Sequence, residues 1–212
     1  MVALMVALPF LPPGFACSRA GQSPRAEEAK VNTSNQNEAA LGIFQPIEGT
    51  PYLMASLDNV GSRSEKLSTS GSYWTGDQSR NLVFLDTNTL ESHRLFETNA
   101  YVIVQTDRYS QEINGKAVTQ WLVYQVLKAD TNGNRYLDQK DLRTLGISSA
   151  NGKEYVEVLA GVTDIFGITM VKPGKLVVVY GKDKIKTSSI INLDERKVIT
   201  TKPLIDLGSE VK

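Results

Sequence analysis

Two short runs decide the fold: Trp121-Leu-Val-Tyr-Gln-Val-Leu127 and Leu176-Val-Val-Val-Tyr180. Successive side chains of a strand point to opposite faces of its sheet, so a strand with one wet face alternates apolar and polar residues. Both runs instead carry apolar residues on both faces. We therefore predict that both strands are buried on both sides, as happens where sheets stack face to face in series.

From Leu41 onward the chain consists of short runs rich in Val, Ile, Tyr, Phe and Thr, which is typical of antiparallel β-structure. The expected strands are 52–57, 70–75, 81–86, 93–97, 101–106, 120–128, 143–148, 154–159, 165–171, 175–181, 187–192 and 197–201. Asn114-Gly115, Asn151-Gly152 and Pro173-Gly174 are expected to reverse the chain between strands. No segment after residue 41 has a long apolar repeat of helical period, so the sequence predicts an all-β fold rather than an α/β fold.

Three segments share a weak internal similarity in which a strand, a polar turn and a second strand follow one another: 81–95, 143–155 and 188–199. The first and third resemble the outer hairpin of a β-propeller blade. We therefore expect an antiparallel, propeller-like stack of about three blades. A curled or open sheet is an alternative to a closed ring, and a two-layer β-sandwich is a further alternative.

The composition excludes some classes of function and leaves others open. The chain has 212 residues with 23 basic and 23 acidic side chains, and this zero net charge argues against a nucleic-acid partner. The only cysteine is Cys17 and the only histidine is His93, so an intramolecular disulfide is excluded and a metal site would need mainly oxygen ligands. We assign residues 41–212 to a single all-β domain.

The N-terminal residues 1–16 predict a secretory signal peptide. They are uncharged and mostly apolar, too short to span a bilayer as a helix, and end in the small residue Ala16. Pro9, Pro12 and Pro13 argue against a buried strand or helix here. Cleavage after Ala16 would make Cys17 the first residue of the mature chain.

The Ala16-Cys17 pair resembles the cleavage site of bacterial lipoproteins, in which the cysteine is lipidated. The segment departs from that pattern at Gly14-Phe15 and in having no basic residue before the apolar run. The resemblance implies a membrane anchor at Cys17, with 18–40 as a flexible polar tether that has too few large apolar side chains to fold. Ser18 in place of aspartate favours the outer membrane, facing the periplasm, if the source is Gram-negative.

The segment 130–141, Asp-Thr-Asn-Gly-Asn-Arg-Tyr-Leu-Asp-Gln-Lys-Asp, places oxygen donors at the spacing that suits calcium. The candidate ligands are Asp130, Asn132, Asn134, the Tyr136 carbonyl, Asp138 and Asp141. The loop resembles the calcium loops of EF-hand and dockerin proteins, and a loop between the strands of propeller-type bacterial lipoproteins. That resemblance implies a structural Ca²⁺.

Three residues of this loop depart from the calcium pattern. Asn134 stands where an acid is usual, Arg135 replaces the glycine of the sharp turn, and Asp141 replaces a longer glutamate. Arginine at positive φ costs free energy, and its charge would lie close to the cation. The alternative is a polar connection between strands whose side chains cap their own backbone.

The sequence therefore supports several hypotheses about function and contains no recognisable catalytic motif. We expect a cell-envelope lipoprotein that acts as a non-catalytic interaction or scaffold module for another envelope protein. One alternative is a glycosidase-like hydrolase of an envelope polymer, whose acids meet only in the fold. Another is a degenerate fragment of a larger propeller protein. His93 is expected to have a surface or cross-strand role, and Lys182, Lys184 and Lys186 to form a solvated strand edge.

Overall fold

The computed structural model describes residues 39–59, 79–205 and 208. These residues form thirteen strands and no helix, and all strand pairs are antiparallel, which confirms the predicted all-β class. Within this part of the chain no helix is long and apolar enough to cross a membrane. The predicted signal peptide 1–16, the lipidation site Cys17, most of the tether 18–40 and the expected strand 70–75 lie outside the described residues.

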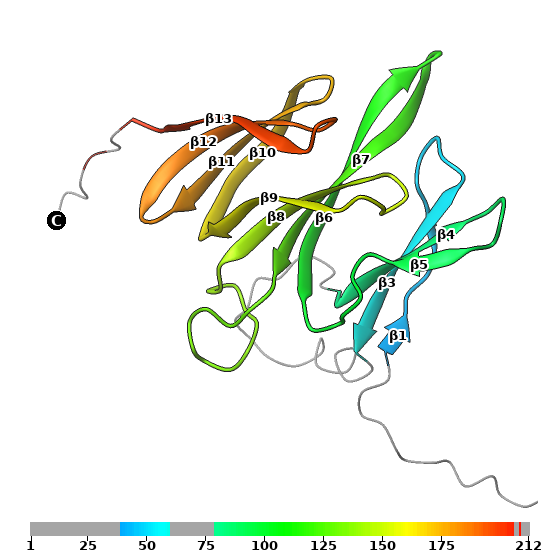
Figure 1. The fold of residues 1–212 in the computed structure, drawn as a ribbon, viewed down its shortest axis with the longest axis horizontal. Helices are drawn as coiled ribbons and strands as arrows, with labels where there is room; N and C mark the ends of the chain where they lie inside the picture. Colours follow the sequence, from blue (N-terminus) through cyan, green and yellow to red (C-terminus); the bar gives the residue numbers. More distant parts are fainter. Residues whose placement is uncertain (1–38, 60–78, 206–207, 209–212) are drawn as a thin grey trace, which may run out of the picture. The chain divides into compact units, whose positions relative to one another are not determined.

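The strands form three sheets that follow one another along the chain (Figure 1). The N-terminal sheet contains β1 (Ala39–Leu41), β2 (Gln45–Pro46), β3 (Tyr52–Asn59), β4 (Asn81–Asp86) and β5 (Ser92–Arg94). The middle sheet contains β6 (Val102–Ile113), β7 (Lys116–Leu127), β8 (Arg143–Ser149) and β9 (Val156–Val162). The C-terminal sheet contains β10 (Asp164–Lys172), β11 (Lys175–Lys182), β12 (Ile185–Asn192) and β13 (Lys197–Pro203).

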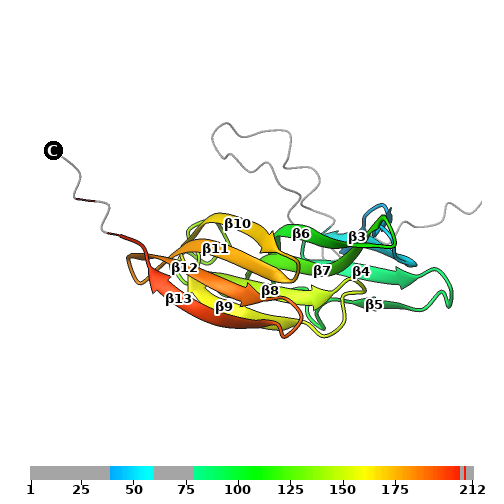
Figure 2. The same cartoon turned by 90° about the horizontal axis from the view of Figure 1, so that it is seen from above.

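Two apolar layers hold these sheets together in series. In the first layer, Leu82 and Phe84 of the N-terminal sheet pack with Leu122, Tyr124 and Val126 of the middle sheet. The second layer joins the opposite face of the middle sheet to the C-terminal sheet, and its members are Trp121, Val123, Leu145, Ile147, Val162, Leu176, Val178, Tyr180, Ile191 and Leu193. Neither layer joins the N-terminal sheet to the C-terminal sheet within the described residues. The stack is therefore open, and it has three sheets rather than the two of a sandwich (Figure 2).

The two runs that decided the fold have different outcomes. All residues from Trp121 to Leu127 are buried, which confirms the prediction for the strand at the centre of the stack. In the second run, Leu176, Val178 and Tyr180 are buried but Val177 and Val179 are only half-buried. The prediction of burial on both faces is wrong for this strand, because it lies in the last sheet and no further sheet among the described residues covers it.

The internal similarity corresponds to a repeated structural unit. Its three segments form the β4–β5, β8–β9 and β12–β13 hairpins, which are the last two strands of each sheet. This is the position of the outer hairpin in a propeller blade, as the sequence predicts. The three sheets are thus equivalent units that stack on one another.

Some strand ends differ from the prediction. β6 continues to Ile113, past the expected end at residue 106, and pairs with β7 up to the Asn114-Gly115 turn. Both turn residues have positive φ, 52° and 73°, as a tight two-residue hairpin requires. Two β-bulges in this hairpin bend its strands, and the middle sheet is curled (Figure 1). β1 begins at Ala39, two residues before the predicted start of the domain.

The β8–β9 turn packs against the N-terminal sheet through Gly152. This glycine has φ of 77°, and a Cβ atom at its position would lie 2.2 Å from Cε2 of Phe84, whose side chain is fully buried. Glycine is therefore required here twice, by the backbone conformation and by the close approach of an aromatic ring. The contact fixes the distance between the middle and N-terminal sheets.

We expect Gly152→Ala to lower the free energy of unfolding by roughly 2–4 kcal/mol, because it adds overpacking to backbone strain. Gly115→Ala is the matched control, since Gly115 has φ of 73° but no atom within 4 Å of its Cβ position. That control should cost only about 1 kcal/mol. Urea denaturation measures both, and equal losses for the two variants would contradict the proposed contact with Phe84.

Candidate functional site

The predicted calcium loop connects β7 to β8, and Asp141 joins its two ends. One carboxylate oxygen of Asp141 accepts hydrogen bonds from the backbone N–H groups of Thr131 and Asn132, at 2.7 and 3.2 Å. The other oxygen accepts the N–H of Asp138 at 2.8 Å. The side chain is 1% exposed. These hydrogen bonds, that from Asp138 above all, lower the pKa of Asp141, so the carboxylate stays ionised in the folded loop.

Asp130 caps the first half of the loop. Its carboxylate accepts the backbone N–H groups of Gly133 at 2.7 Å, Asn134 at 3.2 Å and Arg135 at 2.6 Å. Arg135 has φ of 72°, so the sequence correctly identifies this position as one that would favour glycine. Arginine is strained in this conformation.

Three of the predicted ligands, Asn132, Asn134 and Asp138, meet in the second half of the loop. The amide nitrogens of Asn132 and Asn134 donate to the two oxygens of Asp138, at 3.1 and 2.7 Å. The amide oxygens of the same two residues accept backbone N–H groups, that of Asn134 and that of Tyr136 respectively. The loop therefore satisfies its side-chain oxygens with its own N–H groups.

This geometry limits how the loop could hold a cation. Among the described residues, no three His, Cys, Asp or Glu side chains are grouped closely enough for one metal ion. A calcium ion would therefore depend on the amide oxygens of Asn132 and Asn134 and on the Tyr136 carbonyl, and both amides would have to turn away from their present partners. The fit to calcium is incomplete, whereas the hydrogen bonds fit the alternative of a self-capped polar connection. Calcium ligation stays a prediction.

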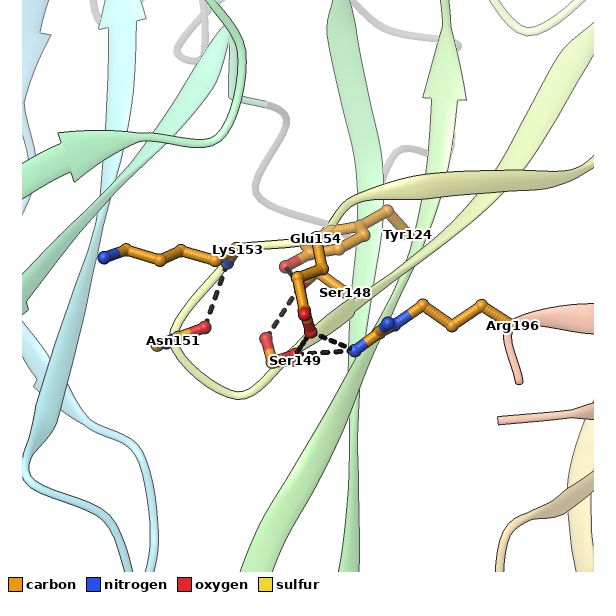
Figure 3. A network of polar contacts seen from close by, with 7 residues as sticks. All are labelled: Tyr124, Ser148, Ser149, Asn151, Lys153, Glu154 and Arg196. Atoms are coloured by element: carbon orange, nitrogen blue, oxygen red, sulfur yellow. Dashed lines mark hydrogen bonds and ion pairs between the residues drawn. The ribbon is translucent and has the colours of Figure 1, made fainter. Parts of the chain in front are cut away.

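A second polar cluster links the middle sheet to the C-terminal sheet (Figure 3). Arg196, in the β12–β13 turn, donates from one guanidinium nitrogen to Ser149 Oγ at 2.7 Å and to Glu154 Oε2 at 2.6 Å. Ser149 Oγ also donates to Glu154 Oε2 at 2.7 Å. Glu154 and Arg196 both have positive φ, 58° and 47°, so two strained turns meet at this ion pair.

The same turns border a hollow of about 420 Å³. It is lined by Thr50, Tyr52, Trp121, Gln120, Asp194 and Arg196, among other residues. Close by, the buried hydroxyl of Tyr124 shares a 2.7 Å hydrogen bond with Ser148 (Figure 3). Desolvation raises the pKa of Tyr124, which keeps this phenol neutral. The polar groups here serve contacts between strands and sheets.

His93 lies on β5, opposite Phe84 on β4, and the two rings stack with their centroids 5.5 Å apart. The imidazole is half-buried. This agrees with the cross-strand role expected from the sequence.

Sequence reasoning missed one surface, the outer face of the C-terminal sheet. Its exposed apolar side chains include Phe166 at 55%, and Lys186 lies over the Phe166 ring with Nζ 5.7 Å from the centroid. The half-buried Val177 and Val179 and the exposed Ile190 occupy the central strands of the same face. The signal was present in the sequence, because residues 176–180 are apolar on both faces, but it does not tell which strand ends the stack.

The ion pair of Glu154 gives a prediction of pH dependence. Hydrogen bonds from Ser149 and Arg196, and the positive charge of Arg196, lower the pKa of Glu154 below its ordinary value of 4.5. A lowered pKa in the folded state stabilises the fold above the unfolded pKa, and this stabilisation is lost as the pH falls through the folded pKa. We therefore expect Glu154→Gln to melt at a lower temperature than the unmodified chain at pH 7, and the gap to close in acid.

Thermal melts followed by circular dichroism from pH 7 to about pH 2 measure this gap. Glu112→Gln, on the exposed end of β6, is the matched control and should show little gap at any pH. A Glu154→Gln gap that stays constant down to the lowest pH would show that the carboxylate charge is not what stabilises the turn.

No protein-family model and no curated protein matches this sequence. The functional evidence therefore comes from three features of this chain: the 130–141 loop, the Arg196 cluster and the outer face of the C-terminal sheet.

Proposed function

We propose that this chain is a cell-envelope lipoprotein whose β domain is an interaction module and binds another envelope protein through the outer face of its C-terminal sheet. The observation that carries this proposal is the apolar surface of that sheet. Apolar side chains exposed singly are ordinary on a soluble protein, but a contiguous set on one sheet face is typical of an interaction surface. Phe166, Val177, Val179 and Ile190 form such a set.

The register of the strands places these residues on one face. Val177 pairs with Ile190 across β11 and β12, and Val179 pairs with Gly167, the residue after Phe166, across β11 and β10. Directly paired residues share a face. The ring of Phe166 reaches the same face, because it meets Lys186, which pairs with Gly181 two positions beyond Val179.

The carboxylates favour this proposal over a hydrolase. A general acid at neutral pH needs a raised pKa, as in the acid of a glycosidase. The carboxyl pKa shifts that the fold produces at Asp141, Glu154 and Glu195 are all downward, and their causes are hydrogen bonds and cations. These three acids are stabilised as charged groups with structural partners.

The membrane anchor in this proposal rests on the sequence of residues 1–40. Expression of the full chain in a bacterium with radiolabelled palmitate tests it, and we expect the label on the unmodified chain and its recovery with the membranes. Cys17→Ser should lose the label. An unmodified chain that is exported without label, or equal label on both chains, would overturn the anchor at Cys17.

A structural calcium ion in the 130–141 loop is a second part of the proposal. It would be held by Asp130, Asn132, Asn134, the Tyr136 carbonyl, Asp138 and Asp141, and would fix the connection between β7 and β8. The strained, positively charged Arg135 opposes binding, because it stands at the turn and repels the cation.

Arg135→Gly should therefore bind calcium several-fold more tightly than the unmodified chain, and Arg135→Ala should gain less because it removes the charge but keeps the strained φ. Isothermal titration of calcium into the full chain measures the affinities, with Asp130→Ala as the control that should not bind. Absence of heat from both the unmodified chain and Arg135→Gly would leave the self-capped polar connection as the role of this loop.

A further inference from the structure

The outer face of the C-terminal sheet differs from both faces of the middle sheet in one respect. β7 and β11 are both apolar on both sides, but β7 is covered on both sides and β11 on one. On the uncovered side, Val177 and Val179 are half-buried, and Ile190 and Phe166 are 36% and 55% exposed. This sheet has the side-chain pattern of a sheet inside a stack but lies at its end.

The N-terminal sheet has a matching outer face. Leu82 and Phe84 point into the first apolar layer, so Val83 and Leu85 between and beyond them point to the opposite face. Their cross-strand partners Ala55 and Leu53 share that face, and so do the paired residues Leu57 and Leu41. Leu41 is 52% exposed. Within the described residues no sheet packs on this face.

The two end sheets carry opposite charge. Residues 164–205 contain eight basic and four acidic side chains, whereas residues 39–59 and 79–99 contain two basic and five acidic side chains. The whole chain is neutral, so the charges are segregated between its two ends. Opposite charge steers two surfaces together and disfavours the pairing of like surfaces.

We propose that the outer face of the C-terminal sheet of one copy packs on the outer face of the N-terminal sheet of a second copy. The arrangement is head to tail, so the same contact forms twice in a closed pair. Two copies then contribute six stacked sheets, within the four to eight blades of closed propellers, while three sheets are too few to close. This inference rests on the interaction surface of the proposed function and identifies its partner as a second copy of the chain.

Sedimentation of the full chain in reducing buffer with mild detergent tests the pairing, and we expect a dimer at micromolar concentration. Ile190→Glu places a negative charge on the basic face and should meet the acidic sheet of the partner. Leu41→Lys places a positive charge on the acidic end. Each variant should raise the dissociation constant at least tenfold, and Ile113→Glu, at the 44% exposed tip of the β6–β7 hairpin, is the matched control that should remain a dimer.

Mixing the two variants decides the orientation of the contact. A head-to-tail pair of Ile190→Glu with Leu41→Lys retains one unmodified contact, and its other contact joins opposite charges, so the mixture should regain the dimer. A Leu41→Lys chain that stays a dimer by itself would show that like faces pair, and would overturn the head-to-tail arrangement. A monomeric unmodified chain at all concentrations would overturn self-association.

Failure of this inference can be told apart from failure of the proposed function. A photo-crosslinking residue at position 179 of the membrane-anchored chain reports whether the outer face of the C-terminal sheet is covered in the envelope. Crosslinks to a different protein would refute the second copy as partner but leave the interaction module standing. No crosslink from position 179, with the same yield as from position 113, would refute both.

Discussion

Burial of the middle sheet on both faces is the constraint on which the rest of this structure depends. Leu122, Tyr124 and Val126 of β7 face the N-terminal sheet, and Trp121 and Val123 face the C-terminal sheet. A strand of this kind cannot lie at a wet surface, because burying its apolar side chains contributes about 1.5–3 kcal/mol each. Two further sheets must therefore cover it. The single polar residue inside the run, Gln125, is satisfied by Gln105 and Arg143.

The β8–β9 turn adds geometry to this apolar packing. On one side Gly152 admits the ring of Phe84, and on the other Ser149 and Glu154 bind Arg196. One turn thus contacts all three sheets and fixes their spacing. Its cost is two residues held at positive φ, which the surrounding contacts compensate. The loop at 130–141 has a similar economy, because its acids and amides replace a separate core with hydrogen bonds to its own backbone.

Much of the fold could be predicted from local sequence, and the limits have physical causes. Alternation along Trp121–Leu127, the Asn114-Gly115 turn and the three similar hairpins depend on neighbouring residues only. The same alternation at Leu176–Tyr180 did not reveal that its second face lacks a covering sheet, since that depends on where the stack ends. The sequence identified the oxygen donors of the 130–141 loop, but not that their partners are backbone N–H groups, because Asp and Asn suit both roles. The Arg196–Glu154 pair joins residues far apart in the chain, and nothing in either local sequence marks it.

Native-state amide hydrogen exchange tests the central claim, the burial of the middle sheet, most directly. Amides of β7 and β8 should exchange only through global unfolding and show the highest protection, whereas β5 and β13, at the edges of the end sheets, should exchange through smaller local openings. The account predicts this order along the stack, with Leu122–Val126 the slowest segment. Exchange of β7 as fast as β13 would contradict it, because a strand covered by two sheets cannot open before a strand at an edge.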